Sequence, residues 1–570
     1  MNRILTIAAL SAFTLGAQTT PPTAVAPLSD AQDRPVMRTI PDPSAPPRVG
    51  VSLTQRSLSV QEAIELALAN NLDIEIERTN VDNAAQSVTA ARGLFDPAFR
   101  WTPLFTSDNI PVASVLQGSG GKLTNEGLVN NFSLRQKLER WGTVGRIDFN
   151  NSRQTTNNPF SSFNPTLSSG LLVAITQPLV RGFRIDRDRT EIRVRIKQVD
   201  LARVDLETRI IEIVSRTEQG YYDLVAAREG VGVAQEQVGL GREQLAINQR
   251  LVDSGTLAPV EISAAEAELQ RRVDTWYSSL AAVTETENNL KSLIAPERQA
   301  SIWNDEILPS DSGLLKAQIE DLHEAVKIAL KNRPELRAVT VRSGINDVQK
   351  ELNANLRKPQ VDLVAQYGLN GLAGTLSTIP NPLANANTPL YDRLNQLSVA
   401  QGLQPISTGG FEGTPSALVG SYGTALSNLF GANYQSFQVG VSLDFNIRNR
   451  TADATYGQTL INEKRLKLER IRAEQIIEAQ IRNALQGIET GRQRIAAAEA
   501  SARAAKEKLD SERRLYQTGE STNFLVLTRQ NEYADSRRRS VVARLDFNKS
   551  VSRFEQALGT TLATHRVNIR

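Results

Sequence analysis

Hydrophobic residues in two segments of the chain recur at alternating steps of four and three residues, which is the period of supercoiled helices. Small residues within the second series allow close approach of neighbouring backbones. The pattern predicts helices over about 185–254 and 450–518, each ~100 Å long at ~1.5 Å per residue. The first series is Ile192, Ile196, Val199, Arg203, Leu206, Ile210, Ile213 and Thr217, and the second is Ile477, Ile481, Ala484, Ile488, Gly491, Ile495, Ala498, Ala502, Ala505 and Leu509.

Shorter helical segments flank the two long ones. We expect helices of roughly 35 residues at 60–93 and 321–356, and helices of roughly 40 residues at about 257–295 and 521–562. Placed end to end, one helix of each kind matches the length of a long helix. The sequence therefore predicts hairpins in which one continuous helix lies against two shorter, stacked helices.

Other segments alternate hydrophobic and polar residues with a period of two. Residues 437–447 and 361–369 show this most clearly, and 98–105, 130–153 and 170–180 show it less regularly. Strands of about ten residues with one hydrophobic and one polar face are typical of transmembrane β-barrels, although a half-buried strand of a soluble sandwich has the same pattern. We expect the stretch 370–435, rich in Gly, Asn, Pro and Ser, to be a long loop outside the cell.

The order of these elements occurs twice, and so do individual residues. Two sets of matches far apart in the chain have shifts that agree within two residues, which indicates a tandem duplication. We place repeat 1 at 57–300 (strands about 95–181), a linker at 301–320, repeat 2 at 321–562 (strands about 359–447) and a C-terminal tail at 563–570. Glu62, Ala63, Ala67, Leu68, Asn70 and Pro97 recur 262 residues later, and Arg250, Leu251, Gly255 and Glu268 recur 264 residues later as Arg514, Leu515, Gly519 and Glu532.

The N-terminal residues have the features of an export signal. Arg3 precedes an apolar run from Ile4 to Leu15, which is shorter than the ~20 residues needed to cross a bilayer. We expect a signal peptide at 1–17. Residues 18–56 contain eight prolines and are expected to form a disordered tether. An exported chain with no later apolar run of spanning length is either soluble outside the cytoplasm or inserted as a β-barrel.

Composition excludes several function classes. The net charge of +3 and the absence of a polybasic segment give no indication of a nucleic-acid partner. The chain has no cysteine and two histidines, His323 and His565, so most triads and thiolate metal sites are excluded. Walker, GxSxG, HExxH and CxxC motifs are absent. We therefore expect no enzyme activity, no cofactor and no metal site.

Three parts of the chain resemble the TolC-like outer-membrane efflux proteins over residues 57–562. They are the opening SLSVQEAIELALANN, the segment TQPLVRGFR before the first long helix, and the helix–turn–helix sites around Gly255 and Gly519. The resemblance implies an α+β membrane protein that forms a homotrimer. Its strands, about four per protomer, would form one twelve-stranded β-barrel in outer-membrane lipid. An added hairpin around Gly142 would raise that number.

The resemblance further implies a periplasmic α-helical barrel that docks on a periplasmic adaptor protein and an inner-membrane transporter. Tyr516 and Glu261 match a tyrosine and an acid that latch the tunnel shut in well-known members, although they are equally compatible with ordinary tip residues. Leu525 and Thr528 occupy positions where some members carry aspartates, which favours a partly apolar constriction. Gly255 and Gly519 mark the tip turns expected to meet the adaptor.

These features predict a passive exit duct for small molecules in a tripartite efflux pump, located in the outer membrane with a periplasmic extension. The residues leave the cargo open, so a duct for type I polypeptide secretion is an alternative. A periplasmic coiled-coil protein without a pore is the alternative from a different class.

Overall fold

The computed structural model describes residues 48–51, 54–114, 121–311, 313–315, 321–379, 388–406 and 414–567. The chain divides into two units, Met1–Pro47 and Arg48–Arg570, and every described residue lies in the second. The expected signal peptide at 1–17, and the tether as far as Pro47, lie outside the described residues. In the part that is described, no helix is both long enough and apolar enough to cross a membrane.

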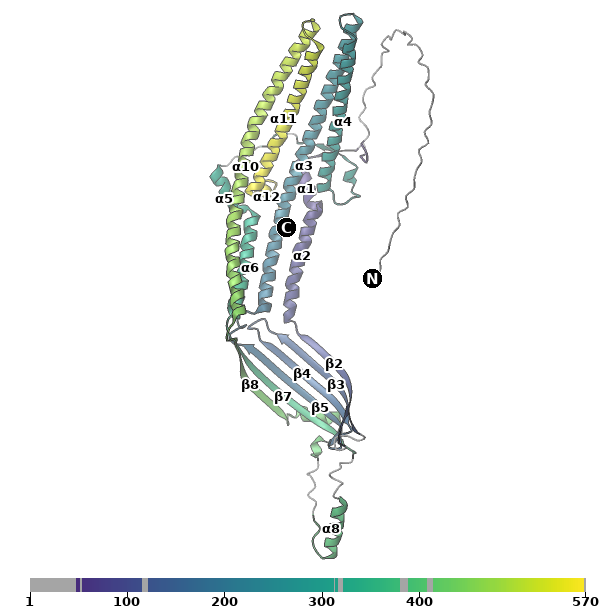
Figure 1. Cartoon of the computed structure of the whole chain (residues 1–570), viewed down its shortest axis with the longest axis vertical. Coiled ribbons are helices and arrows are strands. Elements are labelled where there is room, and N and C mark those ends of the chain that lie inside the picture. Colours follow the sequence, from purple (N-terminus) through teal and green to yellow (C-terminus); the bar gives the residue numbers. More distant parts are fainter. Residues whose placement is uncertain are drawn as a thin grey trace, which may run out of the picture. The chain divides into compact units, whose positions relative to one another are not determined.

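Two long helical hairpins dominate the described unit (Figure 1). The first joins α3 (Arg187–Asp253) to α4 (Val260–Ile294), and the second joins α10 (Arg450–Gln517) to α11 (Asn523–Leu558). The two long helices contain 67 and 68 residues. Their bounds confirm the helices predicted from the heptad pattern.

The predicted helices at 60–93 and 321–356 are each broken into two, so the prediction of single helices was wrong. At the first break, Asn71 has extended backbone angles, and its side chain accepts a hydrogen bond from Asp73 N at 3.0 Å, which starts a new helix. At the second break, Pro334 lacks an N–H and holds Arg333 in an extended conformation. The four segments are α1 (Val60–Asn70), α2 (Leu72–Arg92), α5 (Leu322–Asn332) and α6 (Pro334–Leu356).

The predicted stacking of helices is confirmed. Helices α2 and α6 pack against the part of α3 nearest the sheet, and α4 packs against the remainder (Figure 1). Most residues of the two heptad series are buried along these contacts, but Ile196 and Arg203 are exposed. Two large hydrophobic clusters lie among the described helices. One is centred on Ile213 and Leu290 of the first hairpin, and the other on Ile481 of the second.

A six-stranded antiparallel sheet adjoins the ends of α2, α3, α6 and α10 (Figure 1). Repeat 1 supplies four strands and repeat 2 supplies two, so the estimate of about four per protomer was too low. The predicted hairpin around Gly142 is confirmed, because Gly142 lies in the β3–β4 turn with φ +70. In sheet order, the strands are β2 (Ala98–Pro111), β3 (Lys122–Lys137), β4 (Val144–Thr156), β5 (Phe163–Pro178), β7 (Gln360–Leu376) and β8 (Gln435–Asp444).

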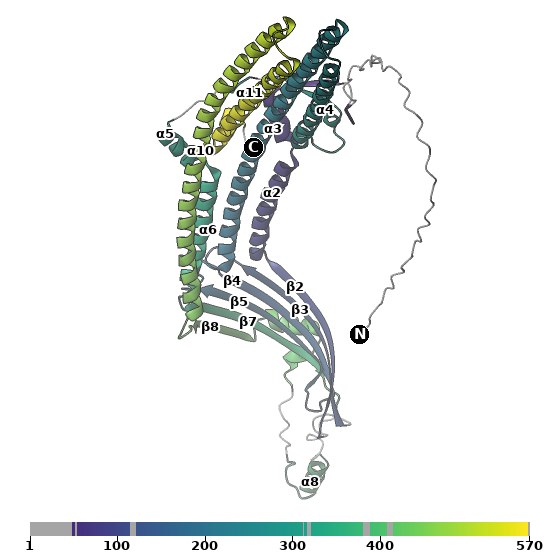
Figure 2. The same cartoon turned by 45° about the horizontal axis from the view of Figure 1, so that its top comes forward.

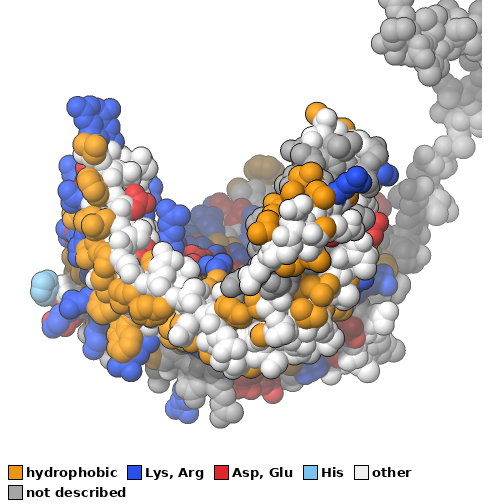
Figure 3. Space-filling model, turned by 90° about the horizontal axis from the view of Figure 1, so that it is seen from below, with side chains coloured by type: hydrophobic (Ala, Val, Ile, Leu, Met, Phe, Trp, Pro, Cys, Tyr) orange, Lys and Arg blue, Asp and Glu red, His pale blue; other side chains and the backbone are white. Residues whose placement is uncertain are grey.

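Strand register places hydrophobic side chains side by side on one face of this sheet. Trp101 lies opposite Phe132, which lies opposite Phe149, and their rings stack in sequence. At the other edge, Tyr367 lies opposite Phe437, whose side chain is 76% exposed. Figure 3 shows hydrophobic side chains along the arms on either side of a hollow. An exposed hydrophobic sheet face of this kind is a surface for lipid or protein.

The stretch 370–435 is not the simple loop that was predicted. Strand β7 continues to Leu376, and the stretch contains α8 (Thr388–Ala400) and α9 (Tyr422–Phe430). Helix α9 packs on the sheet (Figure 2), where a Cβ atom on Gly371 would lie 2.1 Å from the carbonyl oxygen of Ala425. A glycine in the strand therefore permits a close helix–sheet contact that alternation alone does not indicate.

The expected linker and the end of the expected tether are also structured. Strand β1 (Gln55–Leu58) pairs in parallel with β6 (Glu306–Pro309), which lies inside the predicted linker at 301–320. The expected C-terminal tail begins inside α12 (Thr561–Thr564), and Val567 packs against the first hydrophobic cluster. Short strands with no clear alternation explain why both segments were predicted to be irregular.

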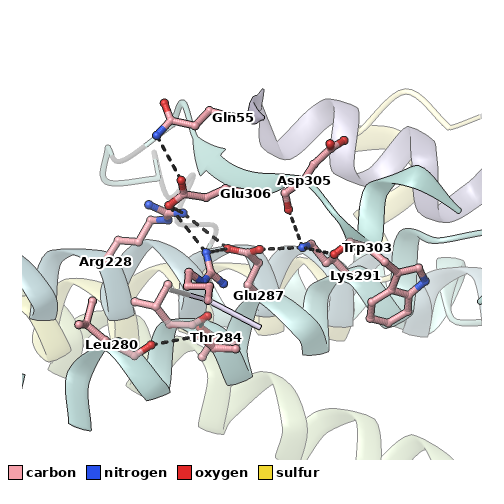
Figure 4. A network of polar contacts seen from close by, with 12 residues as sticks. Gln55, Arg228, Leu280, Thr284, Glu287, Lys291, Trp303, Asp305 and Glu306 are labelled. Atoms are coloured by element: carbon pink, nitrogen blue, oxygen red, sulfur yellow. Dashed lines mark hydrogen bonds and ion pairs between the residues drawn. The ribbon is translucent and has the colours of Figure 1, made fainter. Parts of the chain in front are cut away.

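A buried network of charges holds the β1–β6 region against the first hairpin (Figure 4). Glu287 of α4 is fully buried, forms an ion pair with Lys291 at 2.8 Å, and accepts a hydrogen bond from Arg48 at 2.9 Å. Arg228 of α3 lies 3.5 Å from the same carboxylate. The Lys291 ammonium also donates to the backbone oxygen of Asp305 at 2.6 Å. The contact between Arg48 and Glu287 joins segments that are 239 residues apart in the sequence.

The same network extends to the carboxylate of Glu306 in β6. Burial acts to raise the pKa of Glu306, but hydrogen bonds from Arg228 and Gln55 outweigh this effect and hold the pKa below its ordinary value. Glu306 is therefore ionised in the folded protein and fixes the strand to α3.

Candidate gate at the helical tips

Each long hairpin ends in a tight turn with the same hydrogen-bond pattern. After α3, Gly255 N donates to Val252 O at 2.9 Å, and Thr256 N donates to Leu251 O at 2.9 Å. The turn around Gly519 after α10 repeats both bonds with its own residues. This pair of bonds is the Schellman motif, which needs a left-handed residue. Gly255 has φ +74 and Gly519 has φ +81, so the predicted tip glycines are confirmed as turn residues.

Gly519→Ala should loosen the second tip without affecting the helices. Nothing lies within 4 Å of the position of a Cβ atom at this site, so the cost is the left-handed conformation itself, about 1–2 kcal/mol. We expect amide hydrogens around this turn to exchange several-fold to tenfold faster in the variant. Gly457→Ala, at an open position inside α10, is the matched control and should not accelerate exchange at the tip.

Below the turns, a buried polar network joins all four hairpin helices. Tyr516 of α10 donates to Asn248 Oδ1 of α3 at 2.8 Å, and Gln244 Nε2 donates to the same oxygen at 2.8 Å. Gln244 Nε2 also lies 3.1 Å from Asn523 Oδ1 of α11. Asn523 Nδ2 donates to Glu261 Oε2 of α4 at 2.8 Å. Because Gln244 and Asn248 are at most 1% exposed, these bonds are shielded from water.

The predicted direct hydrogen bond between Tyr516 and Glu261 is wrong. The tyrosine hydroxyl donates to Asn248 instead, and Glu261 accepts from Asn523. The two residues still interact electrostatically, because burial and then the Glu261 charge raise the pKa of Tyr516. Asn248 also donates to the backbone oxygen of Glu261 at 3.3 Å, so one amide connects both predicted residues. Sequence reasoning missed Asn248, Gln244 and Asn523.

The contact between the two hairpins contains further polar residues away from the tip. Gln237 lies one heptad before Gln244 on α3, and Gln530 lies one heptad after Asn523 on α11. Both are buried, and neither side-chain amide has a hydrogen-bond partner within the described residues. Unpaired buried amides cost about 1–3 kcal/mol each. Gln237 and Gln530 therefore lower the stability of the contact between the two hairpins.

The predicted constriction residues lie on the first turns of α11. Leu525 is 37% exposed, and Thr528 donates its hydroxyl to Phe524 O at 2.8 Å. Phe524 itself, which sequence reasoning missed, is 74% exposed. Its counterpart 264 residues earlier is Val260, which is 69% exposed at the start of α4. Both tips thus present a large hydrophobic side chain, and the shift of 264 residues between the repeats is the signal that could have identified this pair.

Comparison with known proteins agrees with this arrangement. Residues 63–295 match the model of a family described as outer membrane efflux protein. Over these residues the chain is similar to the outer membrane efflux proteins. No curated protein matches significantly by sequence.

Solved structures extend the likeness to both repeats of this efflux protein. The Campylobacter jejuni outer membrane channel CmeC matches with a TM-score of 0.60 at 14% identity, covering 88% of this chain and 85% of that one. The Vibrio cholerae outer membrane protein VceC matches with 0.58 at 12% identity, covering 88% and 96%. The open state of the Neisseria gonorrhoeae outer membrane channel MtrE matches with 0.55 at 14% identity, covering 88% of each. The fold is thus that of the TolC-like channels.

Family and fold together give the coarse function of this efflux protein. It is an outer-membrane efflux channel with a periplasmic tunnel extension. The family is one of channels and not of enzymes, in agreement with the sequence-based prediction.

Proposed function

We propose that this efflux protein is the exit duct of a tripartite efflux pump. It works as a homotrimer whose sheets close into one outer-membrane β-barrel and whose hairpins form a periplasmic tunnel. An inner-membrane transporter and a periplasmic adaptor deliver small molecules to the tunnel, and the protein conducts them passively. The observation that carries the proposal is a sheet with two long unpaired edges, continued by two helical hairpins.

Both edge strands leave backbone groups without partners among the described residues. Strand β2 has 14 residues and strand β8 has 10, and nearly all of their residues are exposed. Unpaired backbone N–H and C=O groups are not tolerated in lipid, so such a sheet must close. Because the sheet has six antiparallel strands, β8 of one copy meets β2 of the next in the antiparallel direction. Copies can therefore continue the same meander around a ring.

The strand number sets the size of the barrel. Three copies of the six-stranded sheet would give eighteen strands, against the twelve implied by the resemblance. Barrel diameter grows roughly in proportion to strand number, and barrels of about 16–18 strands leave an aqueous channel. The β3–β4 hairpin thus favours a duct that is wider in the membrane than that of a four-stranded protomer.

The expected β2–β8 contact can be tested by disulfide trapping, for which a cysteine-free chain is well suited. Thr102→Cys in β2 combined with Gln438→Cys, Gly440→Cys or Ser442→Cys in β8 should give crosslinked trimers for the pair in register. Thr102→Cys combined with Asn150→Cys is the control, because β4 is central and already paired on both sides. A protein that gives no intermolecular product with any β8 position, and elutes as a monomer in detergent, would contradict the trimer.

Transport is tested in cells that lack their own outer-membrane duct. Co-expression of this protein with an adaptor and a drug transporter should restore antibiotic resistance, and the purified protein should conduct in planar bilayers. Restoration of polypeptide secretion without drug resistance would instead support the type I alternative. A protein that neither conducts nor fractionates with outer membranes would support the coiled-coil alternative without a pore.

A further inference from the structure

Three potential metal ligands meet where the two repeats and the C-terminal segment pack together. Glu218 lies on α3 and Glu555 lies on α11, and His565 is the first residue after α12. His565 Nε2 lies 3.7 Å from Glu218 Oε2 and 4.0 Å from Glu555 Oε2, and the three ligand atoms all lie within 4.8 Å of one another. This cluster is not part of the candidate gate.

The approach of His565 depends on the turn that ends α11. Gly559 has φ +70 and reverses the chain, so that α12 returns beside the helix it follows. His565 N donates to Thr561 O at 3.1 Å, which places the imidazole at the end of the short helix. The backbone oxygen of His565 accepts from Gln61 Nε2 at 3.4 Å. The backbone of His565 is therefore held in place from two sides.

Burial makes this cluster unusual. The side chain of Glu218 is 2% exposed and that of His565 is 10% exposed. Glu218 Oε2 and His565 Nε2 form no hydrogen bond within the described part of the chain, although each is directed at the other. Neither carboxylate forms an ion pair with a lysine or arginine of the described residues. A buried carboxylate without a cationic partner is costly, and among the described residues only His565 brings a group to these carboxylates that can become cationic.

The surrounding groups respond to that excess negative charge. Burial, and next the charge of Glu218, raises the pKa of Glu555 to about 7. Burial acts to lower the pKa of His565, but Glu218 and Glu555 outweigh it and raise that pKa. Burial together with the Glu218 charge also raises the pKa of Tyr222.

We propose that Glu218, Glu555 and His565 bind a divalent first-row transition ion, with Zn²⁺ as the probe of choice. One imidazole and two carboxylates are borderline ligands that suit Zn²⁺, Mn²⁺ or Fe²⁺, and two carboxylates match the charge of a divalent ion. An ion about 2.0–2.2 Å from each ligand atom would draw the three groups slightly together. The ion would join α3 of repeat 1 to α11 of repeat 2 and fix the C-terminal segment. This differs from the sequence-based expectation of no metal site.

Metal content of the full-length protein in detergent tests the proposal. After treatment with EDTA and dialysis against Zn²⁺, wild type should retain one tightly bound ion per chain by elemental analysis. His565→Ala and Glu218→Gln should weaken Zn²⁺ binding by at least about tenfold. His323→Ala is the matched control, because it removes the other histidine, which is exposed on α5. Equal binding in wild type and His565→Ala would overturn the assignment.

Co²⁺ gives a readout that does not depend on the stability of the variants. Wild type loaded with Co²⁺ should show visible d–d absorption, and this absorption should vanish on addition of Zn²⁺. If folded wild type shows neither this absorption nor bound Zn²⁺, the three side chains bind protons and no metal ion. That result would overturn the metal site. Channel conductance is measured on the same preparation, so failure of the metal site is distinguished from failure of the proposed duct.

Discussion

Glu287→Gln is expected to destabilise the protein by about 3–5 kcal/mol, because removing one partner from a buried ionic group leaves the others uncompensated. The side chains of Glu287 and Lys291 are both 0% exposed. After the substitution, Lys291 would keep two backbone carbonyls as acceptors but no anion. Arg48 would lose the charge of its partner at 2.9 Å, so the segment before β1 should be held less tightly against the first hairpin. The midpoint of urea unfolding and the rate of proteolysis near Arg48 measure the two effects.

The matched control is Glu285→Gln, two residues earlier on the same helix and exposed. It changes the net charge equally but should alter the free energy of unfolding by no more than about 0.5 kcal/mol. If the two variants unfold at the same urea concentration, the network does not stabilise the fold.

Local patterns in the sequence predicted the helical part of the molecule. The heptad steps around Ile213 and Ile481 set the bounds of α3 and α10, because helix periodicity is a property of neighbouring residues. Gly255 and Gly519 were also predicted from local sequence, since a turn position with left-handed backbone angles favours glycine. Pro334 also carried a local signal, and the prediction of one unbroken helix overlooked it.

Long-range contacts were beyond such patterns. Arg48 and Glu287 are separated by 239 residues, and Tyr516 and Asn248 by 268. The family resemblance identified Tyr516 and Glu261, yet only the packing of four helices shows that Asn248 and Asn523 stand between them. The alternation of hydrophobic and polar residues also failed to predict α9 within 370–435. The position of α9 depends on its close contact with Gly371 of the sheet, which no local strand or loop pattern indicates.

The gate network predicts an order of effects among tip variants. Asn248→Ala should open the channel most, because it removes the acceptor for Tyr516 and Gln244 and a donor to Glu261 O. Each buried polar group left without a partner costs about 1–3 kcal/mol. At ~1.4 kcal/mol per tenfold change, the equilibrium between closed and open tips should shift by at least about tenfold. Open probability in planar bilayers and entry of a large antibiotic into cells measure the shift.

Tyr516→Phe should have a smaller effect in the same direction, since Asn248 Oδ1 would still accept from Gln244 at 2.8 Å. Loss of one hydrogen bond worth about 0.5–1.5 kcal/mol should raise the open probability by a few-fold to about tenfold. Tyr533→Phe is the matched control: its hydroxyl also joins α11 to α3, through Glu236 at 3.3 Å, but farther from the tip. Trimer yield should stay at the wild-type level in all three variants.

Glu261→Gln distinguishes the observed polar network at the tips from a direct hydrogen bond between the Tyr516 hydroxyl and the Glu261 carboxylate. In the observed geometry, a glutamine at this position still offers an oxygen to Asn523 Nδ2, which now lies 2.8 Å from Glu261 Oε2. The backbone oxygen that accepts from Asn248 is unchanged. Open probability should therefore stay near the wild-type value. If Glu261→Gln opens the channel as much as Tyr516→Phe, the two residues act as a direct pair in the closed trimer. If Asn248→Ala also conducts like wild type, the gate lies elsewhere on the tips, and the exposed Phe524 and Val260 become the next residues to replace.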